Sequence, residues 1–329
     1  MKRVGYLTER IASLDNLYEA FRKACRGKQC KKEVLAFRSD FDRNIFMLRQ
    51  QILSGNVEVG DYRFFTIYDP KERIICAAPF AERVLHHALM NVCHDYFDCS
   101  MIPDTYATRP NKGVYAALEK SVQAASHYKY VVKLDFRKYY DSINHDVLKQ
   151  KLGRKFKDKV LLHIFACIID SYHPDTGLGL PIGNLTSQYF ANIYLSSLDH
   201  FAKERLRLPV FIRYMDDILM ASDSKSFLMD CVHALNHYSH SELHLNLKPP
   251  ICHPSPKGVV FLGYKILPYH YQLSGRSKRR FRSKLIAYEG HLAAGRWNER
   301  QYAEHILPLI SFAAHAESWR FRHACLKLI

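Results

Sequence analysis

The chain has 329 residues, 48% of them hydrophobic, which is enough to bury a sizeable core. Its 48 lysines and arginines against 32 aspartates and glutamates give a net charge of +16, which favours a polyanionic partner. No stretch approaches about 18 consecutive apolar residues, and MKRVGYLTERIASL lacks the apolar run of a signal peptide. We therefore expect a cytoplasmic protein that does not engage a membrane, with its nine cysteines reduced.

The first part of the chain is expected to be mainly helical. Residues 12–53 contain SLDNLYEAFRKAC, a capping residue followed by apolar positions at helical spacing. Between residues 62 and 80, two β-rich runs flank DPKE, which is typical of a hairpin. Helical periodicity then returns in AERVLHHALMNVCHDYF, residues 81–97.

The remainder of the chain mixes strands and helices. Residues 128–143 predict a strand that runs into a turn, and Ser142 or Asn144 can cap the helix that begins HDVLKQKL. Three further segments predict, in order, a turn with a long helix, a hairpin, and a strand or hairpin: residues 180–206, 209–223 and 257–266. Helical patterns follow up to residue 329. This order predicts an α+β fold with antiparallel hairpins rather than a doubly wound parallel sheet.

Three aspartates lie next to β-rich segments. Asp135 ends the run VVKLDF, and Asp216 with Asp217 lies at or near the hairpin turn of RYMDDILMA. If these elements are neighbours in one sheet, three carboxylates converge and repel one another, and divalent cations remove that cost. Mg²⁺ prefers carboxylate oxygens with substrate phosphates, and a pair of such ions suits nucleotidyl transfer. The alternative for any one of them is a turn or helix-capping residue.

Five motifs resemble those of reverse transcriptases and occur in the order of that family. YMDD is similar to the catalytic hairpin, and VVKLDFRKYYDSI to the motif with the other catalytic aspartate. FLGY (261–264) resembles the primer-grip hairpin. YDPKERIICAAPFAERVLHHAL and TYATRPNKG (105–113) resemble two successive fingers motifs. Together they cover roughly residues 60 to 265.

The resemblance implies a right-hand polymerase fold with fingers, a palm holding the antiparallel sheet, and a short helical thumb. The expected parts are an N-terminal helical extension (1–60), fingers (61–127 and 144–179), palm (128–143 and 180–266) and thumb (267–329).

The resemblance also implies roles for residues at the matching positions. Asp135, Asp216 and Asp217 would be catalytic and would hold two Mg²⁺ ions together with the backbone of Phe136. Tyr140 lies at the steric-gate position, where a large ring collides with a ribose 2′-hydroxyl. The residues expected to bind the deoxynucleoside triphosphate are Lys71, Arg73, Tyr140, Ile182 and Gly183. Those expected to contact template and primer are Arg109, Gln188, Phe261, Leu262, Gly263, Tyr264, Arg276, Lys278, Arg279 and Arg280.

Two basic features need separate interpretation. GRSKRRFRSKL, residues 275–285, would follow a phosphate backbone if helical, and a solvated charge run is the alternative. Members of the family often carry a lysine after the catalytic hairpin as a candidate general acid. Lys248 is nearby, but the usual spacing places an apolar residue at that position, so we interpret Lys248 as a lysine on a solvated loop.

The segment PIGNLTSQ (181–188) departs from most of the family. Ile182 replaces a glutamine that lies against the incoming nucleotide, and Gln188 replaces a proline. The I-G-x-x-x-S-Q pattern is similar to the reverse transcriptases of diversity-generating retroelements. These copy a template-repeat RNA into cDNA with errors opposite adenine, and the copy diversifies a target gene. If the nucleotide loses a polar contact at Ile182, base selection becomes less accurate. The alternative is that Ile182 only packs a turn, with no effect on accuracy.

The resemblance further implies the partners: template-repeat RNA, the cDNA or primer, deoxynucleoside triphosphates, and a small basic accessory variability protein that forms a pentamer. Two alternatives stay open. One is a retron or group II intron-type reverse transcriptase, although we expect no maturase, endonuclease or ribonuclease H segment here. The other is a polymerase-like RNA-binding protein without catalysis, against which the presence of all three aspartates argues.

Overall fold

The computed structural model describes residues 3–68 and 72–326, and the chain divides into two compact units. The first unit comprises Met1–Pro103, Phe136–Phe201 and Leu235–Leu247, and the second comprises Asp104–Asp135, Ala202–Ala234 and Lys248–Ile329. Each unit is therefore assembled from segments far apart in the sequence. The predicted boundaries of fingers, palm and thumb stay a prediction.

The first unit is mostly helical. Its helices are α1 (Thr8–Ile11), α2 (Leu14–Cys25), α3 (Lys32–Ser39), α4 (Phe41–Ser54), α5 (Phe80–Asp98), α7 (His145–Lys155), α8 (Lys159–Asp170) and α9 (Leu185–His200), with a 3₁₀ turn at Tyr140–Ser142. The predicted helical stretch 12–53 is thus three helices. Between the first two lies Gly27, whose φ of 71° is a left-handed conformation that ends helices.

Two side chains fix the ends of neighbouring helices in the first unit. Asn144 accepts a hydrogen bond from the backbone N–H of Val147 (3.0 Å), so Asn144 caps α7. Asp158 caps α8 through Leu161 N–H (3.2 Å) and also accepts from the backbone N–H of Thr8 (3.0 Å). One carboxylate therefore both starts α8 and holds the beginning of the chain against it.

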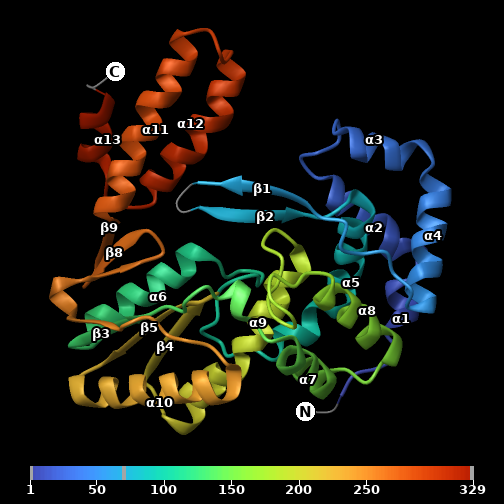
Figure 1. The fold of residues 1–329 in the computed structure, drawn as a ribbon. Coiled ribbons are helices and arrows are strands. Elements are labelled where there is room, and N and C mark those ends of the chain that lie inside the picture. Colours follow the sequence, from blue (N-terminus) through green and yellow to red (C-terminus); the bar gives the residue numbers. More distant parts are fainter. Residues whose placement is uncertain (1–2, 69–71, 327–329) are drawn as a thin grey trace. The chain divides into compact units, whose positions relative to one another are not determined.

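The hairpin predicted between residues 62 and 80 is confirmed. Strands β1 (Arg63–Ile67) and β2 (Arg73–Ala77) pair antiparallel, from Arg63 opposite Ala77 to Ile67 opposite Arg73. The hairpin leads directly into α5 (Figure 1). Lys71, which comes between the two strands in the sequence, lies outside the described residues.

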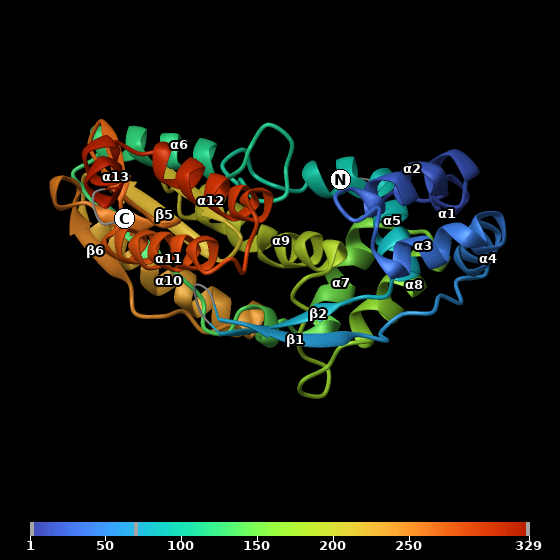
Figure 2. The ribbon, with the colours of Figure 1, turned by 90° about the horizontal axis from the view of Figure 1, so that it is seen from above.

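A four-stranded antiparallel sheet forms the centre of the second unit. Its strands are β3 (Tyr130–Leu134), β4 (Val210–Tyr214), β5 (Asp217–Ser222) and β6 (Ile251–Pro254), in the order β4-β5-β3-β6. Helix α6 (Val114–His127) lies on one side of this sheet and α10 (Lys225–Leu243) on the other, as Figures 1 and 2 both show. Because both faces are covered, β4 and β5 are apolar and buried along almost their whole length.

A second, three-stranded sheet connects to the C-terminal helices. It contains β7 (Val259–Phe261), β8 (Tyr264–Leu267) and β9 (His270–Leu273), and α11 (Gly275–Ala293), α12 (Glu299–Ala314) and α13 (Trp319–Leu326) follow. Leu262 and Gly263 form the β7–β8 turn with φ values of 49° and 90°, the left-handed values of a tight hairpin turn. The mixture of helices with antiparallel sheets confirms the predicted α+β class. Nowhere in residues 3–68 and 72–326 is a helix both long and apolar enough to cross a bilayer.

Candidate active site

The strand register of the second unit brings the three aspartates to one end of its sheet. Leu134, the last residue of β3, lies opposite Ile218 in β5, and Tyr214 at the end of β4 lies opposite Asp217. Asp135 follows Leu134 directly, and Asp216 lies in the turn before β5. The hairpin predicted over residues 209–223 is therefore present, with Asp216 in its turn and Asp217 opening its second strand.

A buried arginine holds this turn in an unfavourable backbone conformation. Met215 has a φ of 53°, which costs a non-glycine residue on the order of 1 kcal/mol or more. The carbonyl of Met215 accepts a hydrogen bond from Nη1 of Arg213 (3.0 Å), a side chain with no exposed surface. Arg213 is itself fixed through its backbone, which donates to Asp104 O (2.9 Å) and accepts from Tyr106 N–H (2.9 Å). Sequence reasoning missed Arg213, because an arginine inside an apolar run gives no local sign of its partner.

The electrostatics of the turn centre on Asp216. Burial, the largest cause, and the neighbouring charges of Asp217 and Asp135 together raise the pKa of this carboxyl to about 6. The backbone N–H and Lys248 act in the opposite direction on the same pKa. Asp216 thus lies where negative charge is in excess, a site that favours a cation.

Two lysines neutralise the other two carboxylates. Nζ of Lys133 lies 2.8 Å from Oδ1 of Asp217, and Nζ of Lys248 lies 2.5 Å from Oδ2 of Asp135. The backbone N–H of Lys248 also donates to the carbonyl of Asp135 (2.8 Å). Interpreting Lys248 as a solvated loop lysine was therefore wrong, because β3–β6 pairing brings its segment back to the aspartates. Lys133 could have been recognised, since it lies two residues before Asp135 on the same face of a strand.

The donor chemistry of this group fits Mg²⁺. No set of three His, Cys, Asp or Glu side chains within the described part of the chain is gathered tightly enough to hold a metal ion by itself. Mg²⁺ does not need such a cage, because it commonly binds one or two carboxylates and takes its other ligands from water and substrate phosphates. The excess negative charge around Asp216 is the feature that such an ion would neutralise.

Lys133→Met tests the lysine pairing. The variant leaves Asp217 without its counter-charge, so we expect the protein in EDTA to lose about 1–2 kcal/mol of stability. Because the site becomes more negative, Mg²⁺ should raise the melting temperature of the variant more than that of the wild type. Thermal melts with EDTA and with Mg²⁺ measure both effects. Lys129→Met is the control, since Lys129 is exposed and lies just before the same strand. Equal behaviour of the two variants would contradict the pairing.

The residues predicted to bind the nucleotide lie in the first unit. Arg73 opens β2 and is exposed, and Tyr140 is half-buried in the 3₁₀ turn. The carbonyl of Ile182 accepts a hydrogen bond from Cys76 N–H (2.8 Å). At Gly183, φ is 124° and a Cβ atom would lie 2.9 Å from the carbonyl oxygen of Cys76. Only glycine allows this turn to lie so close to β2.

Phe136 and Gln188 also belong to the first unit. The Phe136 side chain is 1% exposed, and its backbone forms an antiparallel bridge with Leu247. Gln188 lies half-buried in α9. The side chain of Phe136 is thus held in the core. This agrees with the expectation that only its backbone lies near the metals.

Apart from Gln188 and Arg109, the residues predicted to contact template and primer fall into two groups in the second unit. Phe261 and Tyr264 have no exposed surface, and the Tyr264 hydroxyl donates to Phe312 O (2.7 Å). Their side chains therefore join the hairpin to the C-terminal helices, and only the tip, Leu262 and Gly263, is open to a ligand. The second group is the basic start of α11, where the exposed residues are Arg276, Arg279 and Arg280, and where Lys278 lies over the Phe321 ring (5.7 Å).

Arg109 stands apart from both groups. Its Nη1 donates to the backbone carbonyl of Thr105 (3.0 Å). The guanidinium thus supports the loop that precedes α6, and a contact of Arg109 with template or nucleotide stays a prediction.

Comparison with known proteins shows that the sequence matches one protein family. A family model described as reverse transcriptase (RNA-dependent DNA polymerase) matches residues 69–266, more than half of the chain. Among curated proteins, the putative COX1/OXI3 intron 2 protein of Saccharomyces cerevisiae is 22% identical over 281 residues, covering 64% of this chain and 31% of that protein. Protein YkfC of Escherichia coli is 24% identical over 174 residues, covering 48% of this chain and 45% of that protein. The chain thus spans less than half the length of these relatives.

A solved structure supports the fold. The apo telomerase of Candida tropicalis superimposes with a TM-score of 0.50 at 11% identity, covering 88% of this chain and 70% of that one. At this identity the likeness concerns the fold alone. It confirms the right-hand polymerase fold that the motifs predict.

Proposed function

Because the chain belongs to the reverse transcriptase family, we propose that it is an RNA-directed DNA polymerase that extends a primer on an RNA template with deoxynucleotides. The observation that carries this proposal is the meeting of Asp135, Asp216 and Asp217 at one end of the β4-β5-β3-β6 sheet. Two-metal nucleotidyl transfer needs carboxylates in this arrangement. Primer extension on a defined RNA template is the test.

The three aspartates, with the backbone of Phe136, would hold a pair of Mg²⁺ ions. When bound, these ions would stabilise the negative charge that develops on phosphate oxygens. The contribution of the protein is to fix the carboxylates before substrate arrives. Arg213 does so by holding the turn at Met215, and Lys133 and Lys248 do so by orienting Asp217 and Asp135. Preorganised charge of this kind lowers the cost of reorganisation during reaction.

We propose that the nucleotide is bound by first-unit residues, as the family motifs imply. Arg73, with Lys71 two residues before it in the sequence, would bind the triphosphate, because positive charge stabilises transferring phosphates. Ile182 and Gly183 would lie against the sugar and base. The turn that carries them is anchored to β2 through Cys76, so the base-selecting side chain is held by a rigid backbone.

The finer proposal is the reverse transcriptase of a diversity-generating retroelement, which copies template-repeat RNA into cDNA with errors opposite adenine. Its support is the I-G-N-L-T-S-Q sequence that begins at Ile182. The pentameric accessory protein belongs to the same proposal. An intron-type reverse transcriptase is the second candidate, favoured by the likeness to the yeast intron 2 protein. Paired template and variable repeats beside the gene would favour the first candidate.

Ile182→Gln tests the finer proposal. A glutamine restores a polar contact worth about 1 kcal/mol, so errors opposite template adenine should fall roughly fivefold. Sequencing of cDNA made on an RNA template measures the error rate at each base. Ile182→Val keeps a branched aliphatic side chain and should leave the rate unchanged. If the glutamine variant makes as many adenine errors as the wild type, Ile182 has no part in fidelity.

A further inference from the structure

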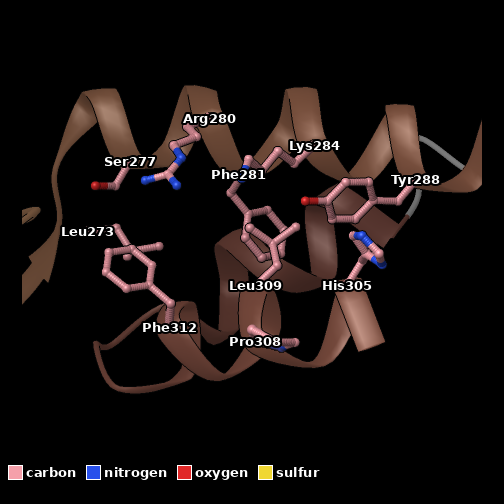
Figure 3. Close-up of a pocket in the computed structure, with 10 residues that line it drawn as sticks. All are labelled: Leu273, Ser277, Arg280, Phe281, Lys284, Tyr288, His305, Pro308, Leu309 and Phe312. Carbon is pink, nitrogen blue, oxygen red and sulfur yellow. The ribbon is translucent and has the colours of Figure 1, made fainter. Parts of the chain in front are cut away.

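Helices α11 and α12 pack together but leave a cavity of about 220 Å³ between them (Figure 3). Its floor is apolar and comes from Leu273, Phe281, Leu309 and Phe312. Leu273 and Phe281 are each only 4% exposed, so this floor is continuous with the core of the second unit. A cavity of this size is smaller than the about 300–1,000 Å³ typical of pockets for drug-sized ligands. It suits a single ring system.

Aromatic rings form one end of the cavity. Tyr288 extends from α11 and His305 from α12, with ring centroids 5.6 Å apart. Trp297, between the two helices, stacks on His305 at 4.2 Å and lies 5.3 Å from Tyr288. Flat groups that enter such a site gain from stacking, about 1–3 kcal/mol for a nucleobase on an aromatic side chain.

Among the described residues that line the cavity, the charged ones all have the same sign. Arg280 and Lys284 come from successive turns of α11, and no aspartate or glutamate is among the lining residues. Figure 3 shows the guanidinium of Arg280 reaching toward the space between the helices. An occupant that combines a flat apolar group with a negative charge therefore fits both the floor and the rim.

Pro308 interrupts the helical hydrogen bonds of α12 beside the cavity. It lies inside α12 and lines the cavity. Because proline has no N–H, the carbonyl of Glu304 cannot receive its α-helical hydrogen bond.

From these features we infer that the α11–α12 cavity binds one unpaired nucleotide of a single-stranded nucleic acid, with its base inside and its phosphate on Arg280 and Lys284. This inference rests on the proposed function, since a polymerase of this family handles single strands as well as the template–primer duplex. A duplex keeps its bases stacked inside, so it would use the charged rim alone.

Binding of short oligonucleotides of about a dozen nucleotides tests the inference. Each single strand, RNA in one arm and DNA in the other, carries one fluorescent 2-aminopurine, whose emission falls when it stacks on a ring. A blunt duplex of the same length is the third ligand. Lys284→Gln removes a charge from the rim and should weaken binding of all three ligands. Tyr288→Leu should weaken binding of at least one single strand fivefold or more and restore its fluorescence, while duplex affinity changes less than twofold. Leu309→Trp fills the cavity without removing charge and should have the same effect.

Arg296→Gln is the matched control, because it removes one charge from the same helical hairpin outside the cavity. Equal losses for single strand and duplex with Tyr288→Leu and Leu309→Trp, or no loss of single-strand binding with any of the three variants, would overturn the inference. Primer extension by the wild-type protein is measured in parallel. If extension fails while the single-strand effects appear, the proposed function is wrong and the nucleotide site stands.

Discussion

Asp216→Asn is expected to reduce primer extension at least about 10²–10³-fold. Asparagine has nearly the same shape as aspartate but removes the charge that a metal ion would need. The same change should raise the stability of the protein in EDTA by on the order of 2 kcal/mol. The reason is that burial and the neighbouring charges of Asp217 and Asp135 disfavour the ionised carboxylate, as its raised pKa of about 6 indicates. Opposite effects on activity and stability are the mark of a residue kept for catalysis rather than for folding.

Asp223→Asn is the control for this experiment. Asp223 is exposed and follows the far end of β5, where its carboxylate accepts from Lys129 N–H (3.1 Å), a bond that asparagine can keep. We expect extension at the wild-type rate. If Asp216→Asn also extends primers at that rate, the aspartates are not catalytic, and the polymerase-like RNA-binding protein becomes the better account.

Tyr140→Ala is expected to lower the preference for deoxynucleotides over ribonucleotides by about 10–200-fold, the range for one side chain in a selective pocket. The two adjacent tyrosines differ in their surroundings. Tyr139 is 3% exposed and its hydroxyl donates to Ala191 O (2.5 Å), which makes it a core residue. Tyr140 is half-buried, with its ring centroid 5.7 Å from that of Tyr139. Its ring is therefore accessible to a sugar, whereas that of Tyr139 is not.

Competition between deoxynucleotides and ribonucleotides in single-nucleotide extension measures the effect. Tyr140→Phe keeps the ring and should retain the preference for deoxynucleotides. If Tyr140→Ala discriminates as well as the wild type, another side chain excludes the 2′-hydroxyl, and the steric-gate assignment fails.

Local patterns account for the parts of the fold that could be predicted. The hairpins at β1–β2 and β4–β5 have β-rich strands on both sides of a turn signal, and α5 has a clear helical period. The single helical stretch expected over residues 12–53 was too coarse, because the turn at Gly27 depends on a backbone conformation that the pattern does not reveal. The sequence left Ser142 and Asn144 as candidate caps of α7. The hydrogen bond from Val147 N–H to the Asn144 side chain shows that Asn144 is the cap.

The residues of the candidate active site that belong to sequence motifs could be predicted. The aspartates were found because carboxylates next to strands are unusual and their order matches a family. Lys248 was misread because its ion pair with Asp135 depends on β3–β6 pairing, a contact between segments more than a hundred residues apart. The burial of Phe261 and Tyr264 also depends on distant packing, in that case against α12. Long-range register of this kind leaves no trace in a local sequence pattern.

We propose that this chain copies RNA into DNA. The most direct measurement is primer extension by the purified wild-type protein on an RNA template of defined sequence, with deoxynucleotides and Mg²⁺, followed by sequencing of the product. We expect DNA whose sequence follows the template, and no product when EDTA replaces Mg²⁺. Absence of extension by protein that is folded and binds the template–primer would contradict it.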